Sequence, residues 1–228
     1  MTPLVAIPGM MCDARMWGGL DGALSPRRVH HALPVTGGSI ADMAAAILAA
    51  APPRFALAGL SMGGIVAMEM LHQAPDRVAR LALLDTNPLV ERPEVQARRA
   101  PQVARAVSGD LIGVMRDELK PNYLADASDT ATLDLCLAMA RDLGPEVFRR
   151  QSLALRDRAD RTETLAKFAG PALVLMGEAD RLCPRDRHEL MHALMPQSHL
   201  VIVPGAGHLP PLERPAPTFA ALKEWLEP

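Results

Sequence analysis

The sequence predicts an α/β fold with a doubly wound, mostly parallel sheet of about six strands and a helical insertion. Short apolar runs alternate with amphipathic helical patterns in the first part of the chain, and this alternation returns near its end. Between these parts, residues 90–167 show helical periodicity and no strand-like run. We therefore expect an α/β core, formed by residues 1–88 and 168–228, with residues 89–167 inserted as a helical lid.

The composition is that of an ordinary globular protein. The 228 residues are 49% hydrophobic and 22% charged with a net charge of −2, so one sizeable core fits and nucleic-acid binding is not indicated. The three cysteines have neither the even count of a disulfide framework nor the spacing of a metal site. No apolar run is long enough to span a membrane, and no signal-type segment is present. We expect a cytoplasmic protein with no membrane or nucleic-acid partner, no cofactor and no metal.

The first elements of the core follow from the N-terminal sequence. Residues 4–8, Leu-Val-Ala-Ile-Pro, are typical of a buried parallel strand that opens into a loop. A second strand is expected within residues 28–34. Ser39 is a suitable N-cap for a helix that continues to Ala51, where two prolines end it.

Residues 55–69 predict a strand, a sharp turn and a helix. The turn contains Ser61, whose neighbours at two positions on either side are Gly59 and Gly63. Glycine is tolerated where the backbone passes close to itself in a strained conformation, so the Ser61 hydroxyl should stand out from the chain. A serine hydroxyl is a weak nucleophile at neutral pH, and it needs a base to take its proton and donors for the developing oxyanion.

The next apolar strand, residues 81–84, ends at Asp85, which makes this residue a candidate acidic partner. Ligands in parallel α/β sheets gather at the carboxyl ends of strands. After the insertion, residues 171–176 resume the strand pattern and lead to Asp180. The last strand, residues 199–203, precedes a glycine-rich loop with His208, and an amphipathic helix follows.

The sequence Gly59-Leu-Ser61-Met-Gly63, set between a strand and a helix, resembles the nucleophile elbow of the α/β-hydrolases. This resemblance implies a catalytic triad in the family's order, with Ser61 as nucleophile, Asp180 as acid and His208 as base. Asp85 remains the rival for the acid.

In the same family, a loop after the third strand and the residue after the nucleophile supply the backbone N–H groups of the oxyanion hole. The resemblance assigns these donors to Met10 and Met62, with Met11 one register away from Met10.

The chain departs from the family pattern in two ways. It begins at what matches the family's third strand, and its oxyanion loop opens with Pro8 instead of histidine. The shortened sheet exposes a different edge strand, which leaves room for homo-oligomerisation.

The implied reaction is the cleavage of carboxylic ester or thioester bonds through an acyl-serine intermediate. The apolar residues of the insertion favour small to medium apolar acyl groups in a small-molecule substrate. C–C bond hydrolysis, acyl transfer and perhydrolysis would use the same triad, so they stay open as alternatives. A ligand-binding receptor on a hydrolase fold is a further alternative.

Overall fold

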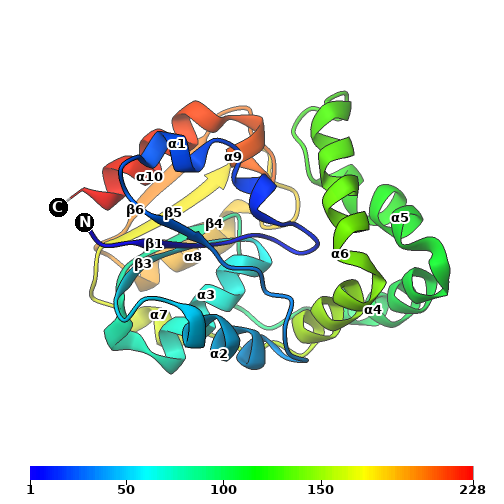
Figure 1. The fold of residues 1–228 in the computed structure, drawn as a ribbon, viewed down its shortest axis with the longest axis horizontal. Helices are drawn as coiled ribbons and strands as arrows, with labels where there is room; N and C mark the ends of the chain where they lie inside the picture. Colours follow the sequence, from blue (N-terminus) through cyan, green and yellow to red (C-terminus); the bar gives the residue numbers. More distant parts are fainter. Residues whose placement is uncertain (228) are drawn as a thin grey trace.

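A computed structural model describes residues 1–227 of the chain, apart from the side chain of Lys120. These residues form a six-stranded sheet in the order β2-β1-β3-β4-β5-β6, and every neighbouring pair of strands is parallel. Helices cover both faces of the sheet (Figure 1). The predicted fold class, a doubly wound parallel sheet of six strands, is therefore confirmed.

The strands coincide with the apolar runs of the sequence. In β1, β3 and β5 every residue is buried, as expected for parallel strands covered on both faces, whereas β2 and β6 form the partly exposed edges. The strands are β1 (Leu4–Ile7), β2 (Val29–His31), β3 (Phe55–Leu60), β4 (Val78–Leu84), β5 (Ala172–Gly177) and β6 (His199–Val203).

Two helical layers enclose the sheet. One contains α1 (Leu20–Leu24), α9 (Pro210–Glu213) and α10 (Pro215–Leu226), and the other contains α2 (Ile40–Ala50), α3 (Met62–Gln73), α7 (Thr162–Ala166) and α8 (Arg185–Leu194) (Figure 1). Alternate residues of β1 face opposite layers: Leu4 packs in the cluster that contains Trp17, and Val5 in the cluster that contains Met43. Ser39 caps α2 with a full capping box, as its sequence predicts.

The segment between β4 and β5 is mainly helical and stands at the carboxyl ends of the strands (Figure 1). Its longer helices are α4 (Pro93–Arg105) and α6 (Thr130–Arg156), with the short α5 (Leu111–Gly113) and single turns between them. A break at Gly144 divides α6 into two parts. The division of the chain into a core and a lid of residues 89–167 stays a prediction.

Several apolar side chains of this segment are buried. Leu111, Met115 and Phe148 belong to the same buried cluster as Met10, while Met139 lies in the cluster on the other side of the sheet. Burial of such side chains provides the main free energy that holds the insertion on the strand ends.

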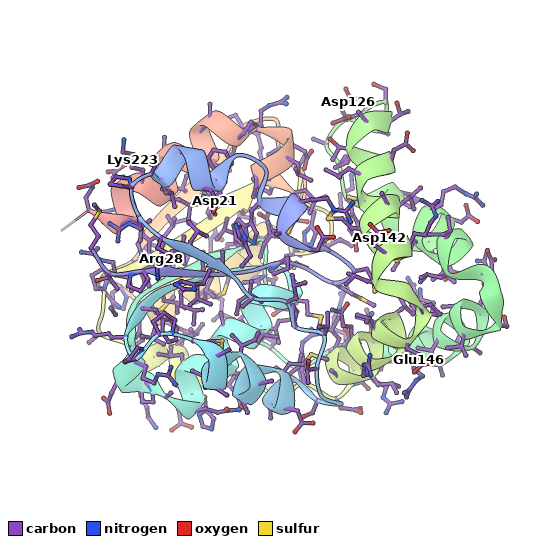
Figure 2. The ribbon with its side chains drawn as sticks, viewed as in Figure 1. Asp21, Arg28, Asp126, Asp142, Glu146 and Lys223 are labelled. Carbon is purple, nitrogen blue, oxygen red and sulfur yellow. The ribbon has the colours of Figure 1, made fainter. Side chains whose placement is uncertain are left out.

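Exposed charges surround this core. The six charged residues labelled in Figure 2 are all exposed. Within residues 1–227, no helix combines the length and the apolar character that crossing a bilayer would require.

Candidate active site

Ser61 occupies a strained turn between β3 and α3. Its φ of 55° and ψ of −119° are unusual for a residue other than glycine. A Cβ atom at Gly59 would overlap the backbone of Gly63, and a Cβ atom at Gly63 would overlap the carbonyl oxygen of Ile7. The two glycines are therefore required by the close approach of β3, α3 and the end of β1.

Hydrogen bonds from the neighbouring strand fix this turn. The N–H of Ser61 donates to the carbonyl oxygen of Leu84 at 2.9 Å, and the hydroxyl of Thr86 donates to the carbonyl oxygen of Ser61 at 2.7 Å. The backbone of Ser61 is thus held on both sides, which keeps its hydroxyl in one position despite the strained dihedral angles.

The three residues proposed for the triad lie together at the carboxyl ends of β3, β5 and β6. The distance from Nε2 of His208 to Oγ of Ser61 is 2.8 Å. On the other side of the ring, Nδ1 of His208 lies 3.0 Å from Oδ1 and 2.9 Å from Oδ2 of Asp180. This arrangement lets the imidazole accept a proton from the hydroxyl while the carboxylate orients the ring.

Asp180 is buried and receives further hydrogen bonds from its own loop. Its Oδ1 accepts the N–H groups of Leu182 at 2.8 Å and Cys183 at 3.2 Å. Burial by itself raises the pKa of Asp180, but the nearby His208 and these two N–H groups lower it below its ordinary value. Asp180 is therefore an anion at neutral pH.

A second carboxylate holds the loop that carries His208. Glu213 accepts the N–H groups of Gly207 at 2.9 Å, Leu209 at 2.9 Å and Ala125 at 2.8 Å. Because Ala125 belongs to the segment between β4 and β5, Glu213 joins the His208 loop to the insertion.

The segment around Tyr123 makes two more contacts with His208. The N–H of His208 donates to the carbonyl oxygen of Tyr123 at 2.6 Å. The ring of Tyr123 packs against the imidazole edge to face, with the ring centroids 5.5 Å apart. The insertion therefore contributes directly to the position of His208.

The hydrogen bonds of the loop after β1 distinguish Met10 from Met11. The N–H of Met11 donates to Oε1 of the buried Gln151 at 2.9 Å, and Nε2 of Gln151 donates to the carbonyl oxygen of Pro34 at 3.0 Å. Within the described part of the chain, the N–H of Met10 has no acceptor. Met62 is the first residue of α3, a position whose N–H has no acceptor inside the helix. The assignment of Met10 and Met62 as oxyanion donors stays a prediction, and the pairing of Met11 with Gln151 favours Met10 over Met11.

Asp85, the rival acid, does not contact the imidazole within the described residues. It is fully buried at the end of β4, and its Oδ1 accepts the N–H of Gly177 at 2.8 Å. The hydrogen bonds of His208 go to Asp180, so the geometry favours Asp180 as the partner of the base.

In the described part of the chain, Asp180, Cys183 and His208 form one group with the residue types and proximity of a metal site, since their ligand atoms lie within 4.8 Å of one another. Asp180 and His208 are already hydrogen-bonded to each other. Burial raises the pKa of the Cys183 thiol well above its usual value, and the charge of Asp180 adds to this effect. A protonated thiol is a poor metal ligand, so these residues fit proton transfer better than metal binding.

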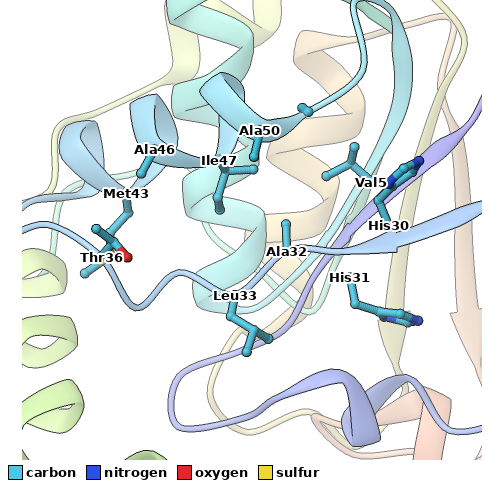
Figure 3. A pocket seen from close by; sticks show the side chains of 11 residues that line it. Val5, His30, His31, Ala32, Leu33, Thr36, Met43, Ala46, Ile47 and Ala50 are labelled. Atoms are coloured by element: carbon cyan, nitrogen blue, oxygen red, sulfur yellow. The ribbon is translucent and has the colours of Figure 1, made fainter.

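A separate cavity of about 290 Å³ lies beside the edge of the sheet, between β2 and α2 (Figure 3). Its lining includes Val5, His31, Met43 and Ile47. It contains none of the residues of the triad or the oxyanion loop, so it is distinct from the candidate active site.

Comparison with known proteins places this geometry in a family. The family model described as "Alpha/beta hydrolase family" matches residues 4–222, which is nearly the whole chain. The chain belongs to the alpha/beta hydrolase family. Its membership confirms the resemblance deduced from the sequence around Ser61, and the chain is accordingly a hydrolase.

Several relatives of this alpha/beta hydrolase are esterases. It is 27% identical to the pimeloyl-[acyl-carrier protein] methyl ester esterase of Edwardsiella ictaluri, over 98% of this chain and 93% of the relative. The esterase of the same name from Xanthomonas oryzae pv. oryzae is 31% identical, over 73% of this chain and 68% of the relative. A solved structure of a thermophilic esterase from Thermogutta terrifontis, with malate bound, has a TM-score of 0.89 and 29% identity, over 99% of this chain and 89% of that chain. These comparisons support an alpha/beta hydrolase that cleaves esters.

Two residues around the site of this alpha/beta hydrolase were not expected from the sequence. Gln151 lies in the middle of a helical pattern, and nothing near it in the sequence indicates a partner 140 residues away. Glu213 follows His208 by five residues. An acidic residue that close to the base was a signal that could have identified it.

Proposed function

We propose that this hydrolase cleaves carboxylic ester or thioester bonds of small to medium apolar acyl substrates, with Ser61, His208 and Asp180 as a catalytic triad. The observation that carries the proposal is the distance of 2.8 Å between Nε2 of His208 and Oγ of Ser61, with Asp180 on the opposite side of the imidazole. The esterase names of the relatives support the same reaction class.

In this mechanism, Oγ of Ser61 attacks the carbonyl carbon while Nε2 of His208 accepts its proton. The carbonyl oxygen becomes an oxyanion, and the N–H groups of Met10 and Met62 stabilise it together with the N-terminus of α3. The C–O or C–S bond then breaks, and His208 returns the proton to the leaving alcohol or thiol. Water attacks the acyl-serine in the same way, with His208 again accepting a proton, and releases the acid.

The residues around Ser61 support an apolar substrate. Met10, Met62 and Ile65 lie at or beside the elbow, and all three are almost completely buried. The relatives act, by their names, on a pimeloyl methyl ester carried by an acyl-carrier protein. Methyl esters of acyl chains of this length are therefore the first specific substrates to compare with simple esters.

The test is the hydrolysis of p-nitrophenyl esters of increasing acyl length by the wild type and by Ser61→Ala. We expect turnover that falls by at least about 10⁴-fold in the variant, because no nucleophile remains. The exposed Ser128 provides a matched control, and Ser128→Ala should keep wild-type turnover. The preferred acyl length then measures the depth of the site.

A fluorophosphonate probe separates the alternatives. Labelling of Ser61 without turnover of any ester would show a reactive serine and direct the search to thioester or C–C bond substrates. Ester turnover that persists in Ser61→Ala would refute the assignment of the nucleophile. Absence of both labelling and turnover would favour a ligand-binding receptor.

A further inference from the structure

Asp85 is a buried acidic residue that the proposed mechanism does not use. It follows β4 directly with a positive φ of 44°, and it has no exposed surface. Its backbone N–H donates to the carbonyl oxygen of Leu175 at 2.9 Å, and its Oδ1 accepts the N–H of Gly177 at 2.8 Å. Within the described residues, no N–H or O–H group donates to its other oxygen, Oδ2. A buried carboxylate with one bare oxygen is costly, because water cannot compensate the lost hydrogen bonds.

The neighbouring Asp180 accounts for the lack of a donor to Oδ2 of Asp85. Asp85 and Asp180 are both hydrogen-bonded to Gly177: Oδ1 of Asp85 accepts its N–H at 2.8 Å, and the N–H of Asp180 donates to its carbonyl oxygen at 3.1 Å. The two residues are therefore neighbours, and their side chains interact electrostatically. Two ionised carboxylates side by side in a buried site repel strongly and have no proton with which to form a hydrogen bond. A single proton shared between the two carboxyl groups would remove this repulsion and bridge the pair.

The surrounding donors decide which carboxyl group is protonated. Asp180 accepts two backbone N–H groups and the His208 ring nitrogen, all of which favour its charged form. Asp85 accepts one backbone N–H and faces no cation within hydrogen-bonding distance among the described residues. The proton therefore belongs on Oδ2 of Asp85.

We propose that Asp85 is a positioning residue, a neutral carboxylic acid whose Oδ2–H donates to the Asp180 carboxylate and holds it against His208. The two N–H groups of its own loop both donate to Oδ1 of Asp180, so Oδ2 can accept the proton of Asp85 in addition to its contact with His208. The triad would then be extended by a fourth member, Asp85, which never contacts substrate. The role rests on the proposed function in that it takes Asp180 as the acid of the triad.

The electrostatic surroundings agree with this assignment. Burial raises the pKa of Asp85 well above its ordinary value, the charge of Asp180 raises it further, and the N–H of Gly177 opposes the change only in part. The titratable groups that act on the two carboxyl groups are His208, Cys183, His188 and Glu213. None of them supplies a cation next to Asp85 that would restore its charge at neutral pH.

Infrared difference spectroscopy of the folded, substrate-free protein tests the protonation state directly. We expect the carbonyl stretch of a protonated carboxylic acid at pH 7 in the wild type, and its loss in Asp85→Asn. Asp21→Asn is the matched control, since Asp21 is an exposed aspartate on α1 (Figure 2) and its removal should leave the band in place. Persistence of the band in Asp85→Asn, or its absence in the wild type, would overturn the proposal. This measurement needs no substrate, so it does not depend on the proposed reaction.

Activity measurements test the positioning role. In Asp85→Asn the amide can still accept from Gly177 and donate to Asp180, and we expect kcat within about 5-fold of the wild type. In Asp85→Ala both bonds are lost, and we expect kcat to fall by about 10- to 100-fold with little change in KM. The acidic fall of kcat should also move to higher pH in Asp85→Ala, because Asp180 is then protonated more readily.

Two results would contradict the role. Equal losses of kcat in Asp85→Asn and Asp85→Ala would mean that the negative charge of Asp85 is needed. Its proton would then not be what positions Asp180. Full activity and an unchanged pH profile in Asp85→Ala would show that the bond to Asp180 is dispensable. If the wild type cleaves no ester at all, the proposed function fails while the infrared result still decides the protonation of Asp85.

Discussion

The N–H of Met11 lies 2.9 Å from Oε1 of Gln151, although the two residues are 140 positions apart in the sequence. This hydrogen bond connects the loop after β1 to α6 of the insertion. It removes Met11 as a donor and leaves the N–H of Met10 without an acceptor among the described residues. The contact with the insertion therefore favours Met10 over Met11 as the predicted oxyanion donor.

Gln151→Leu should reduce kcat by about 10-fold or more and leave KM little changed. The substitution leaves the N–H of Met11 and the carbonyl of Pro34 without their partner, so the oxyanion loop can move away from the position that the transition state requires. Steady-state kinetics on a p-nitrophenyl ester provide the measurement. Gln197→Leu is the control, because Gln197 is exposed and bonds to Phe168 and Gly170. Unchanged kcat in Gln151→Leu would show that this hydrogen bond is not needed for catalysis.

Asp180→Asn should reduce kcat by about 10⁴-fold while the fold is retained. The amide can present its NH₂ group to Nδ1 of His208, which favours the wrong tautomer and provides no charge for the imidazolium. Glu178→Gln is a stringent control, since Glu178 is in the same loop and bonds to the N–H of Gly205 at 3.1 Å. A larger loss in Glu178→Gln than in Asp180→Asn would contradict the assignment of the acid.

Glu213→Gln should lower both activity and stability. Three backbone N–H groups point at the Glu213 carboxylate, and an amide offers one oxygen where the carboxylate offers two. We expect a loss of about 2 kcal/mol in the free energy of unfolding, measured by urea denaturation, together with a reduced kcat. Glu224→Gln, on the exposed side of α10, should leave both values unchanged. Lost stability with full kcat would limit Glu213 to a structural role.

The stability of the protein should fall between pH 6.5 and 4 because of His188. This residue is completely buried, and desolvation lowers its pKa from the ordinary 6.5 to about 4. In that pH range the unfolded chain binds a proton at this histidine that the folded protein does not. The stability contributed by neutral His188 is therefore complete above pH 6.5 and is lost as the pH decreases. The full shift of the His188 pKa corresponds to about 3 kcal/mol in the free energy of unfolding.

Urea denaturation at several pH values measures this effect. His188→Leu should show a smaller dependence of unfolding free energy on pH between 6.5 and 4 than the wild type. His199→Leu, at the exposed start of β6, is the control and should keep the wild-type dependence. An identical pH dependence in His188→Leu and the wild type would assign the acid sensitivity to other groups.

The sequence by itself determined the sheet and the order of the candidate catalytic residues along the chain. Its apolar runs are long enough only for buried strands, and the residues that follow them lie at one edge of a parallel sheet for reasons of topology. The glycines around Ser61 permit a close backbone approach that a side chain at either position would block. These are local or periodic features, which depend on residues close together in the sequence and not on distant contacts.

Only the tertiary structure decided how the groups are held. The pairing of Met11 with Gln151, the hydrogen bond that Ala125 of the insertion donates to Glu213, and the proximity of Asp85 to Asp180 all join residues far apart in the chain. No periodic pattern encodes such contacts, because each depends on the packing of side chains from separate elements. The sequence therefore predicted the candidate triad, while folding determined which backbone N–H groups lack an acceptor and which carboxyl groups come together.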